Sequence, residues 1–125
     1  MTTSELFGWF WMNNIFGQPI KVNQASARVV VEPIPLKDSM FEKNGFKAKR
    51  YSNRNFFEIH RDLPNGTGAL DISLFQEASE PTVFYLSINN YDNDTDVTIT
   101  CKYVHELQKA LRFAEINDIA DNFVV

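Results

Sequence analysis

Residues 82–117, TVFYLSINNYDNDTDVTITCKYVHELQKALRFAEIN, decide the fold. The stretch opens with a β-forming run of aromatic and branched residues, which a polar cluster at residues 89–96 interrupts. Apolar and polar residues then alternate over residues 97–103, as in a strand with one buried side. Beyond this point the apolar period changes to that of a helix. The apolar face of this helix comprises Val104, Leu107, Leu111 and Ala114.

Similar strand patterns precede this stretch. Residues 46–51 and 56–61 predict a hairpin, and residues 70–74 alternate cleanly between apolar and polar side chains. A valine run within residues 27–32 predicts an edge strand, because two prolines follow it and proline cannot donate to a sheet ladder. Short connections favour antiparallel neighbours. The sequence therefore predicts an α+β fold, an antiparallel β-meander of five or six strands with a C-terminal helix packed on one face.

The alternation also predicts which side chains form the core. Residues 37–45 are expected to form a polar loop into which Met40 and Phe41 are inserted. Cys101 is expected to be a small buried hydrophobic residue, since it lies on the apolar side of its strand. The predicted core comprises Phe46, Phe57, Ile59, Leu70, Ile72, Leu74, Phe84, Leu86, Val97, Ile99, Leu107 and Leu111.

The length of 125 residues favours a single domain, 1–125. Within it, 1–17 is an aromatic-rich N-terminal segment that reads equally well as a helix or a strand. Residues 118–125 form either one more helical turn or a short tail.

No export signal and no apolar run of membrane-spanning length are evident, which predicts a cytoplasmic protein that makes no membrane contact.

Charge is distributed unevenly along the chain. Residues 21–61 carry nine basic and four acidic side chains, whereas residues 62–125 carry three basic and eleven acidic ones. Such a split either marks a dipolar surface or is neutralised when the fold brings the halves together. Twelve asparagines are typical of AT-rich genomes, which suggests a phage or mobile-element origin.

The N-terminal aromatic residues are the main candidates for binding a partner. Trp9, Phe10 and Trp11 stand together in a segment with poor helical or strand patterning. Either residues 6–16 leave large aromatic residues at a surface, as is typical of interfaces, or the segment folds over the sheet and completes the core of the monomer. The predicted partner-binding residues are Trp9, Phe10, Trp11 and Phe16. With no catalytic signature in the chain, the sequence predicts a non-enzymatic protein-binding domain, an adaptor or inhibitor of a macromolecular partner. Association with a second copy of the chain is left open.

The alternative function is single-stranded nucleic-acid binding through the basic and aromatic hairpin 43–61. Cations that follow a phosphate backbone, beside aromatic rings on which bases stack, are what this function requires. The candidate residues are Lys47, Lys49, Arg50, Tyr51, Arg54 and Phe56. The acidic isoelectric point of about 5.1 weighs against this alternative.

Other patterns predict no cofactor, no metal and no catalytic residue. Residues 60–63 resemble the start of a kinase catalytic loop, but the asparagine comes too early and no glycine-rich loop precedes it. Asp92, Asp94 and Asp96 have the spacing that opens a calcium loop, yet the later glycine and glutamate are missing. The sequence leaves cation binding at this turn open. Glu58 beside His60 is the one pair it offers for acid–base chemistry.

Overall fold

The computed structural model describes residues 8–23, 30–51, 54–63, 66, 68–77, 79–91 and 95–125. The chain divides into two compact units. Unit 1 combines both ends of the chain, residues 1–36 and 102–125, and unit 2 comprises residues 37–101. The prediction that 1–125 is a single domain stays a prediction.

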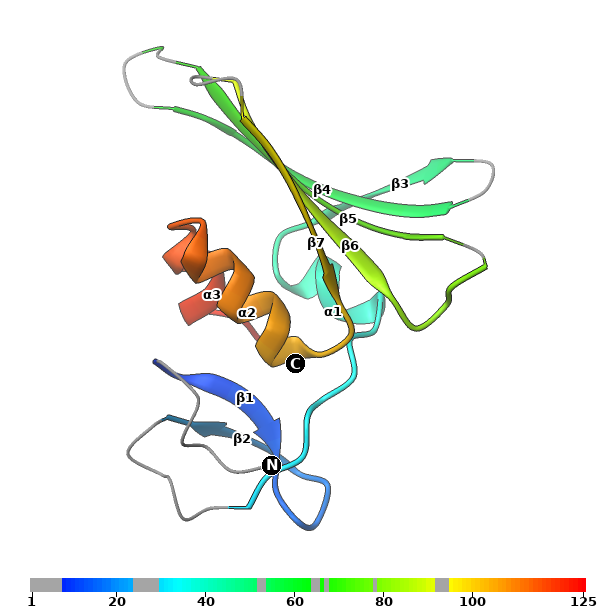
Figure 1. Cartoon of the computed structure of the whole chain (residues 1–125), viewed down its shortest axis with the longest axis vertical. Coiled ribbons are helices and arrows are strands. Elements are labelled where there is room, and N and C mark those ends of the chain that lie inside the picture. Colours follow the sequence, from blue (N-terminus) through cyan, green and yellow to red (C-terminus); the bar gives the residue numbers. More distant parts are fainter. Residues whose placement is uncertain are drawn as a thin grey trace. The chain divides into compact units, whose positions relative to one another are not determined.

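Unit 2 is built on a five-stranded antiparallel sheet in which every strand pairs with its neighbours in sequence (Figure 1). The strands are β3 (Lys47–Tyr51), β4 (Arg54–Asp62), β5 (Ala69–Glu77), β6 (Phe84–Asn90) and β7 (Thr95–Cys101). The predicted α+β class, with its antiparallel meander and C-terminal helix, is confirmed.

The two faces of this sheet differ as the alternating pattern requires. In one row across the sheet, Phe57, Leu74 and Leu86 stand opposite one another and are buried. Val97 is a correction to the predicted core, because its side chain is 49% exposed. It lies on β7, the edge strand of the sheet, so no further strand shields its outer side. Ile59, Leu70 and Ile99 are only half-buried, whereas the other predicted core residues and Cys101 are buried.

The expected polar loop of residues 37–45 contains a short helix, α1 (Ser39–Lys43), which the sequence did not predict. The helix buries Met40 and Phe41. It ends where Gly45 adopts a φ of +90°, a left-handed conformation that glycine enters without a steric penalty. The ring of Phe41 meets those of Phe57 and Phe84 edge-on, each at a centroid distance of 5.0 Å, so α1 lies against the apolar sheet face.

Unit 1 contains a small hairpin and two helices, drawn in blue and in orange to red in Figure 1. Strands β1 (Phe10–Asn13) and β2 (Pro19–Val22) pair antiparallel. Helix α2 (Val104–Phe113) packs against β1 and against α3 (Asn117–Asp121). The α2 N-terminus is closed by Glu106, whose Oε1 accepts from the backbone N–H groups of Lys102 and Tyr103.

On the side of β1 away from β2, backbone groups find hydrogen-bond partners without a full neighbouring strand. The Trp11 N–H donates to Oε1 of Gln108 on α2 at 2.9 Å, and Asn13 exchanges two backbone hydrogen bonds with Glu32. This Glu32 bridge lies in the region of the expected edge strand 27–32, of which residues 27–29 fall outside the described residues. Because a helix side chain and a short bridge cover this edge, β1 presents few free backbone groups.

The C-terminal residues pack into unit 1. Ile119, Ala120 and Phe123 are buried, and the Gln108 amide nitrogen donates to the Ala120 carbonyl at 3.0 Å. Of the two alternatives for residues 118–125, the structure shows the helical turn docked on the core.

Candidate functional site

The connection between β1 and β2 is a tight turn organised by the side chain of Asn14. Its Oδ1 accepts from the backbone N–H groups of Phe16 at 2.9 Å and Gln18 at 3.0 Å. The Asn14 backbone also bonds with Gly17 and Gln18, at 3.0 and 2.9 Å. Gly17 has a φ of +74°, which closes the turn in a conformation that favours glycine. The turn is therefore held by its own hydrogen bonds.

This hydrogen-bonded turn displays two large apolar side chains. Ile15 is 71% exposed and Phe16 is 78% exposed. Asn14 has already satisfied the backbone N–H groups of Phe16 and Gln18, so binding a partner here requires little further ordering of the chain. We call residues 14–18 the apolar turn.

The three other aromatic candidates occupy different environments. Trp9 is exposed, whereas the Trp11 indole N–H donates to the Phe123 carbonyl and Lys21 lies over its ring at 5.3 Å. Phe10 is a correction: it is buried with Met12, Val22 and Val31 in the unit 1 core, so its ring is not available to a partner. Partner binding by Trp9, Trp11 and Phe16 stays a prediction.

The predicted nucleic-acid residues lie along β3 and the start of β4. Lys47 and Lys49 are exposed, and the Lys49 ammonium lies 3.4 Å from the Glu58 carboxylate. The side chains of Arg50, Tyr51 and Arg54 fall outside the part that the structure describes. A phosphate group that bound Lys49 would have to compete with Glu58.

Phe56 begins a row of three aromatic rings on the same sheet face. Its ring stacks on Phe75 at a centroid distance of 6.1 Å, and Phe75 stacks on Tyr85 at 5.3 Å, both nearly parallel. Near-parallel rings at such distances overlap face to face with an offset. Because the rings cover one another, the row offers a stacking base less surface than separate rings would.

His60, part of the pair considered for acid–base chemistry, is held by two carboxylates. Its Nδ1 lies 2.5 Å from Asp71 and its Nε2 lies 3.1 Å from Asp62. The hydrogen bonds to Asp71 and then Asp62 raise the pKa of His60 above its ordinary 6.5. Both ring nitrogens of His60 are therefore engaged by carboxylates other than Glu58, and these two contacts favour its protonated form.

The pKa values of the two histidines are shifted in opposite directions from the ordinary value of 6.5. Burial lowers the pKa of His105, whose Nδ1 has no hydrogen-bond partner among the described residues. His60 therefore stabilises the fold fully below pH 6.5 and loses this contribution as pH rises through its folded pKa. His105 contributes above pH 6.5 and loses its contribution as pH falls through its lowered pKa.

Imidazole NMR signals followed against pH test this assignment. We expect His60 to titrate above pH 6.5 and His105 below it. Replacing Asp71 with asparagine should move the His60 midpoint down and leave that of His105 unchanged. A His60 midpoint below that of His105 would contradict the Asp71–His60–Asp62 geometry.

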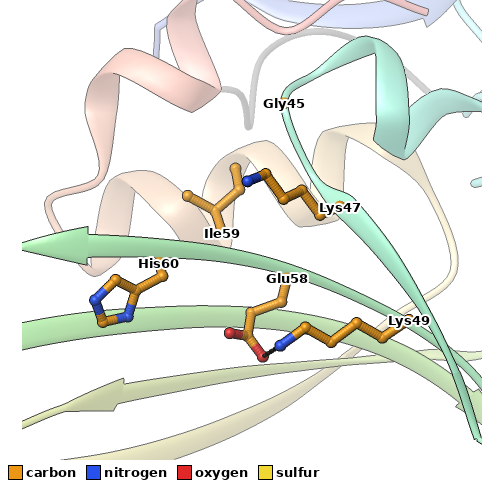
Figure 2. Close-up of a pocket in the computed structure, with 6 residues that line it drawn as sticks. All are labelled: Gly45, Lys47, Lys49, Glu58, Ile59 and His60. Atoms are coloured by element: carbon orange, nitrogen blue, oxygen red, sulfur yellow. Dashed lines mark ion pairs between the residues drawn. The ribbon is translucent and has the colours of Figure 1, made fainter.

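A pocket of about 430 Å³ opens beside this cluster (Figure 2). It is lined by Gly45, Lys47, Lys49, Glu58, Ile59 and His60. Figure 2 shows the Lys49 side chain directed at Glu58, with their ion pair dashed, and the Lys47 side chain extending toward Ile59. Two ammonium groups and one carboxylate leave an excess of positive charge among the lysines and glutamate.

The sequence reading missed two features of these sites. The four named partner-binding residues include Phe16 but not its neighbour Ile15, and the turn itself was not predicted, although Asn14 and Gly17 at the ends of the pair are turn residues. No pattern in the sequence predicts the pocket, because its position depends on where β3 stops pairing with β4.

Among the described residues, no cluster of three or more His, Cys, Asp or Glu side chains has the arrangement of a metal site. The calcium-like turn largely falls outside these residues, since 92–94 are not described. None of the described helices is both long and apolar enough to cross a membrane.

No protein-family model, curated protein sequence or solved structure matches this chain.

Proposed function

We propose that this chain is a non-enzymatic protein-binding domain, an adaptor or inhibitor acting in the cytoplasm, and that the apolar turn contacts its partner. The observation that carries the proposal is the hydrogen-bonded Asn14 turn, which holds Ile15 and Phe16 outward at 71% and 78% exposure. Burying both side chains in a partner would remove their apolar surface from water, which favours association.

The turn also fits the general anatomy of protein interfaces. Anchor residues that dominate binding are large, apolar or aromatic, and insert into a pocket on the partner. A rigid anchor loses less conformational entropy on binding than a mobile one. Trp9, the other exposed aromatic candidate, lies just before β1 and belongs to the same unit.

Single-stranded nucleic-acid binding through Lys47 and Phe56 receives less support. Lys49 already has a carboxylate partner, and the aromatic row is stacked on itself.

The test is a capture experiment from cells of the source organism with matched variants. Replacing Ile15 and Phe16 together with serine should abolish capture of the protein partner, because the anchors are lost. The free energy of unfolding should change by less than about 0.5 kcal/mol per site, as for exposed residues. The wild-type eluate, read by mass spectrometry, defines the partner, and sedimentation of the pure chain tests whether the partner is a second copy.

Phe113→Ser is the matched control. Phe113 is 90% exposed on α2 in the same unit, and the chemical change is the same. This variant should retain the partner. Equal capture by the wild type and the Ile15→Ser, Phe16→Ser double variant would refute the proposal.

A further inference from the structure

One edge of the five-stranded sheet is only partly covered. β4 runs from Arg54 to Asp62, but its pairing with β3 stops at the pair Lys47–Glu58. Residues 59–62 pair with β5 on one side. On the other side, no strand within the described part of the chain lies opposite them. Such an edge is a template for another strand.

The hydrogen-bonding pattern identifies which backbone groups face this open edge. The Leu63 N–H donates to the Gly68 carbonyl at 2.8 Å, just beyond the last β4–β5 pair. In an antiparallel ladder the bonded positions alternate, so Arg61 and Ile59 bond toward β5. The N–H and C=O groups of His60 and Asp62 consequently point toward the open edge.

The pocket of Figure 2 lies at this place. Glu58 and His60 project to one sheet face and Ile59 to the other, since neighbouring side chains alternate. Gly45 adjoins Ile59, because a Cβ built on it would lie 3.9 Å from Ile59 Cδ1. A pocket lined from both faces of one edge is the space that the next strand would fill.

The direction of an added strand and the charge of Lys47 indicate what kind of segment would fill this pocket. An added strand antiparallel to β4 runs in the same direction as β3, so its carboxyl end points toward the start of β3, where Lys47 lies. Lys49 is paired with Glu58, whereas Lys47 has no ion pair within the described residues. A terminal carboxylate would supply the missing charge.

We propose that the open edge of β4 binds the free carboxyl terminus of a partner polypeptide as an added antiparallel strand, with its carboxylate at Lys47. The last residue then pairs with His60, and the residue two positions earlier pairs with Asp62. The Asp62 side chain is 90% exposed, so a lysine or arginine is favoured beside it. The residue between them lies on the face of Ile59, which favours a small apolar side chain.

An array of hexapeptides tests this proposal. All members carry Lys at the third position from the carboxyl end and Val at the second, with the other positions varied, and each is made as free acid and as carboxyl amide. The best free acids should bind the full chain at least about tenfold more tightly than their amides, because only the acid pairs with Lys47. Fluorescence polarisation of labelled peptides gives the affinities.

Two variants separate the carboxylate site from general charge. Lys47→Ala should reduce binding of the free acid about tenfold and leave the weaker binding of the amide unchanged. Lys43→Ala is the matched control, since Lys43 is also an exposed lysine of unit 2, on α1, and does not line the pocket. It should bind both forms as the wild type does.

Amide hydrogen exchange reports the strand pairing itself. Peptide binding should slow exchange at the N–H groups of His60 and Asp62, while the Arg61 N–H, already bonded to β5, should exchange equally slowly in both states. Absence of binding by any free acid below 1 mM, on the order of the weakest specific contacts, would overturn the proposal. Equal affinity for acids and amides would overturn it as well, as would protection confined to other strands.

This site is independent of the apolar turn. The Ile15→Ser, Phe16→Ser double variant should bind the peptides with wild-type affinity. Failure of the peptide experiment therefore leaves the proposed function standing, and failure of the capture experiment leaves the peptide site standing.

Discussion

Replacing Phe41 with alanine is expected to destabilise the protein by about 3–5 kcal/mol, the usual loss for a buried phenylalanine. Phe41 is completely buried and lies within 5.0–6.0 Å, centroid to centroid, of the rings of Phe46, Phe57 and Phe84. Removing it leaves a cavity at the point where α1 meets the sheet. Urea unfolding followed by circular dichroism measures the change in the free energy of unfolding.

Phe113→Ala provides the comparison, because it removes the same atoms from a side chain that is 90% exposed. It should change the free energy of unfolding by less than about 0.5 kcal/mol. A loss below about 1 kcal/mol for Phe41→Ala, well outside the range for buried aromatics, would show that α1 is not part of the folded core.

Replacing Gln108 with methionine is expected to cost about 2–4 kcal/mol. Gln108 is buried, and its amide joins two elements by accepting from the Trp11 N–H of β1 and donating to the Ala120 carbonyl of α3. Methionine has a similar volume, so packing is largely kept and the two backbone groups lose their partners. Each buried group left unpaired costs about 1–3 kcal/mol.

Lys109→Ala is the matched control on the same helix, since Lys109 is exposed. It should leave thermal and urea unfolding nearly unchanged. Unfolding of Gln108→Met at the wild-type urea midpoint would mean that the Gln108 hydrogen bonds contribute nothing to unit 1.

The sequence predicted the sheet well because its signal is local. Alternation over residues 70–74 and 97–103 depends only on neighbouring side chains, and the pleat enforces it. Whether a strand lies at an edge depends on the whole sheet, which is why Val97 was assigned to the core and is exposed. The short helix α1 was missed because five residues carry too little periodicity to indicate a helix.

The sites were harder to predict, because each depends on contacts between distant residues. Phe10 and Trp9 are adjacent in sequence, yet one is buried with Val31 and the other is exposed. The Asn14 turn was recognisable in principle from its residue types. The open edge of β4 was not, since no local pattern reveals that β3 is four residues shorter than its neighbour.

The central claim is that Phe16, held outward by Asn14, anchors a protein partner. With the captured partner purified, titration calorimetry of the wild type, Phe16→Ala and Phe113→Ala tests it most directly. We predict that Phe16→Ala weakens binding by about 2 kcal/mol or more, roughly 30-fold, while Phe113→Ala matches the wild type. Equal affinities for Phe16→Ala and the wild type would contradict the claim.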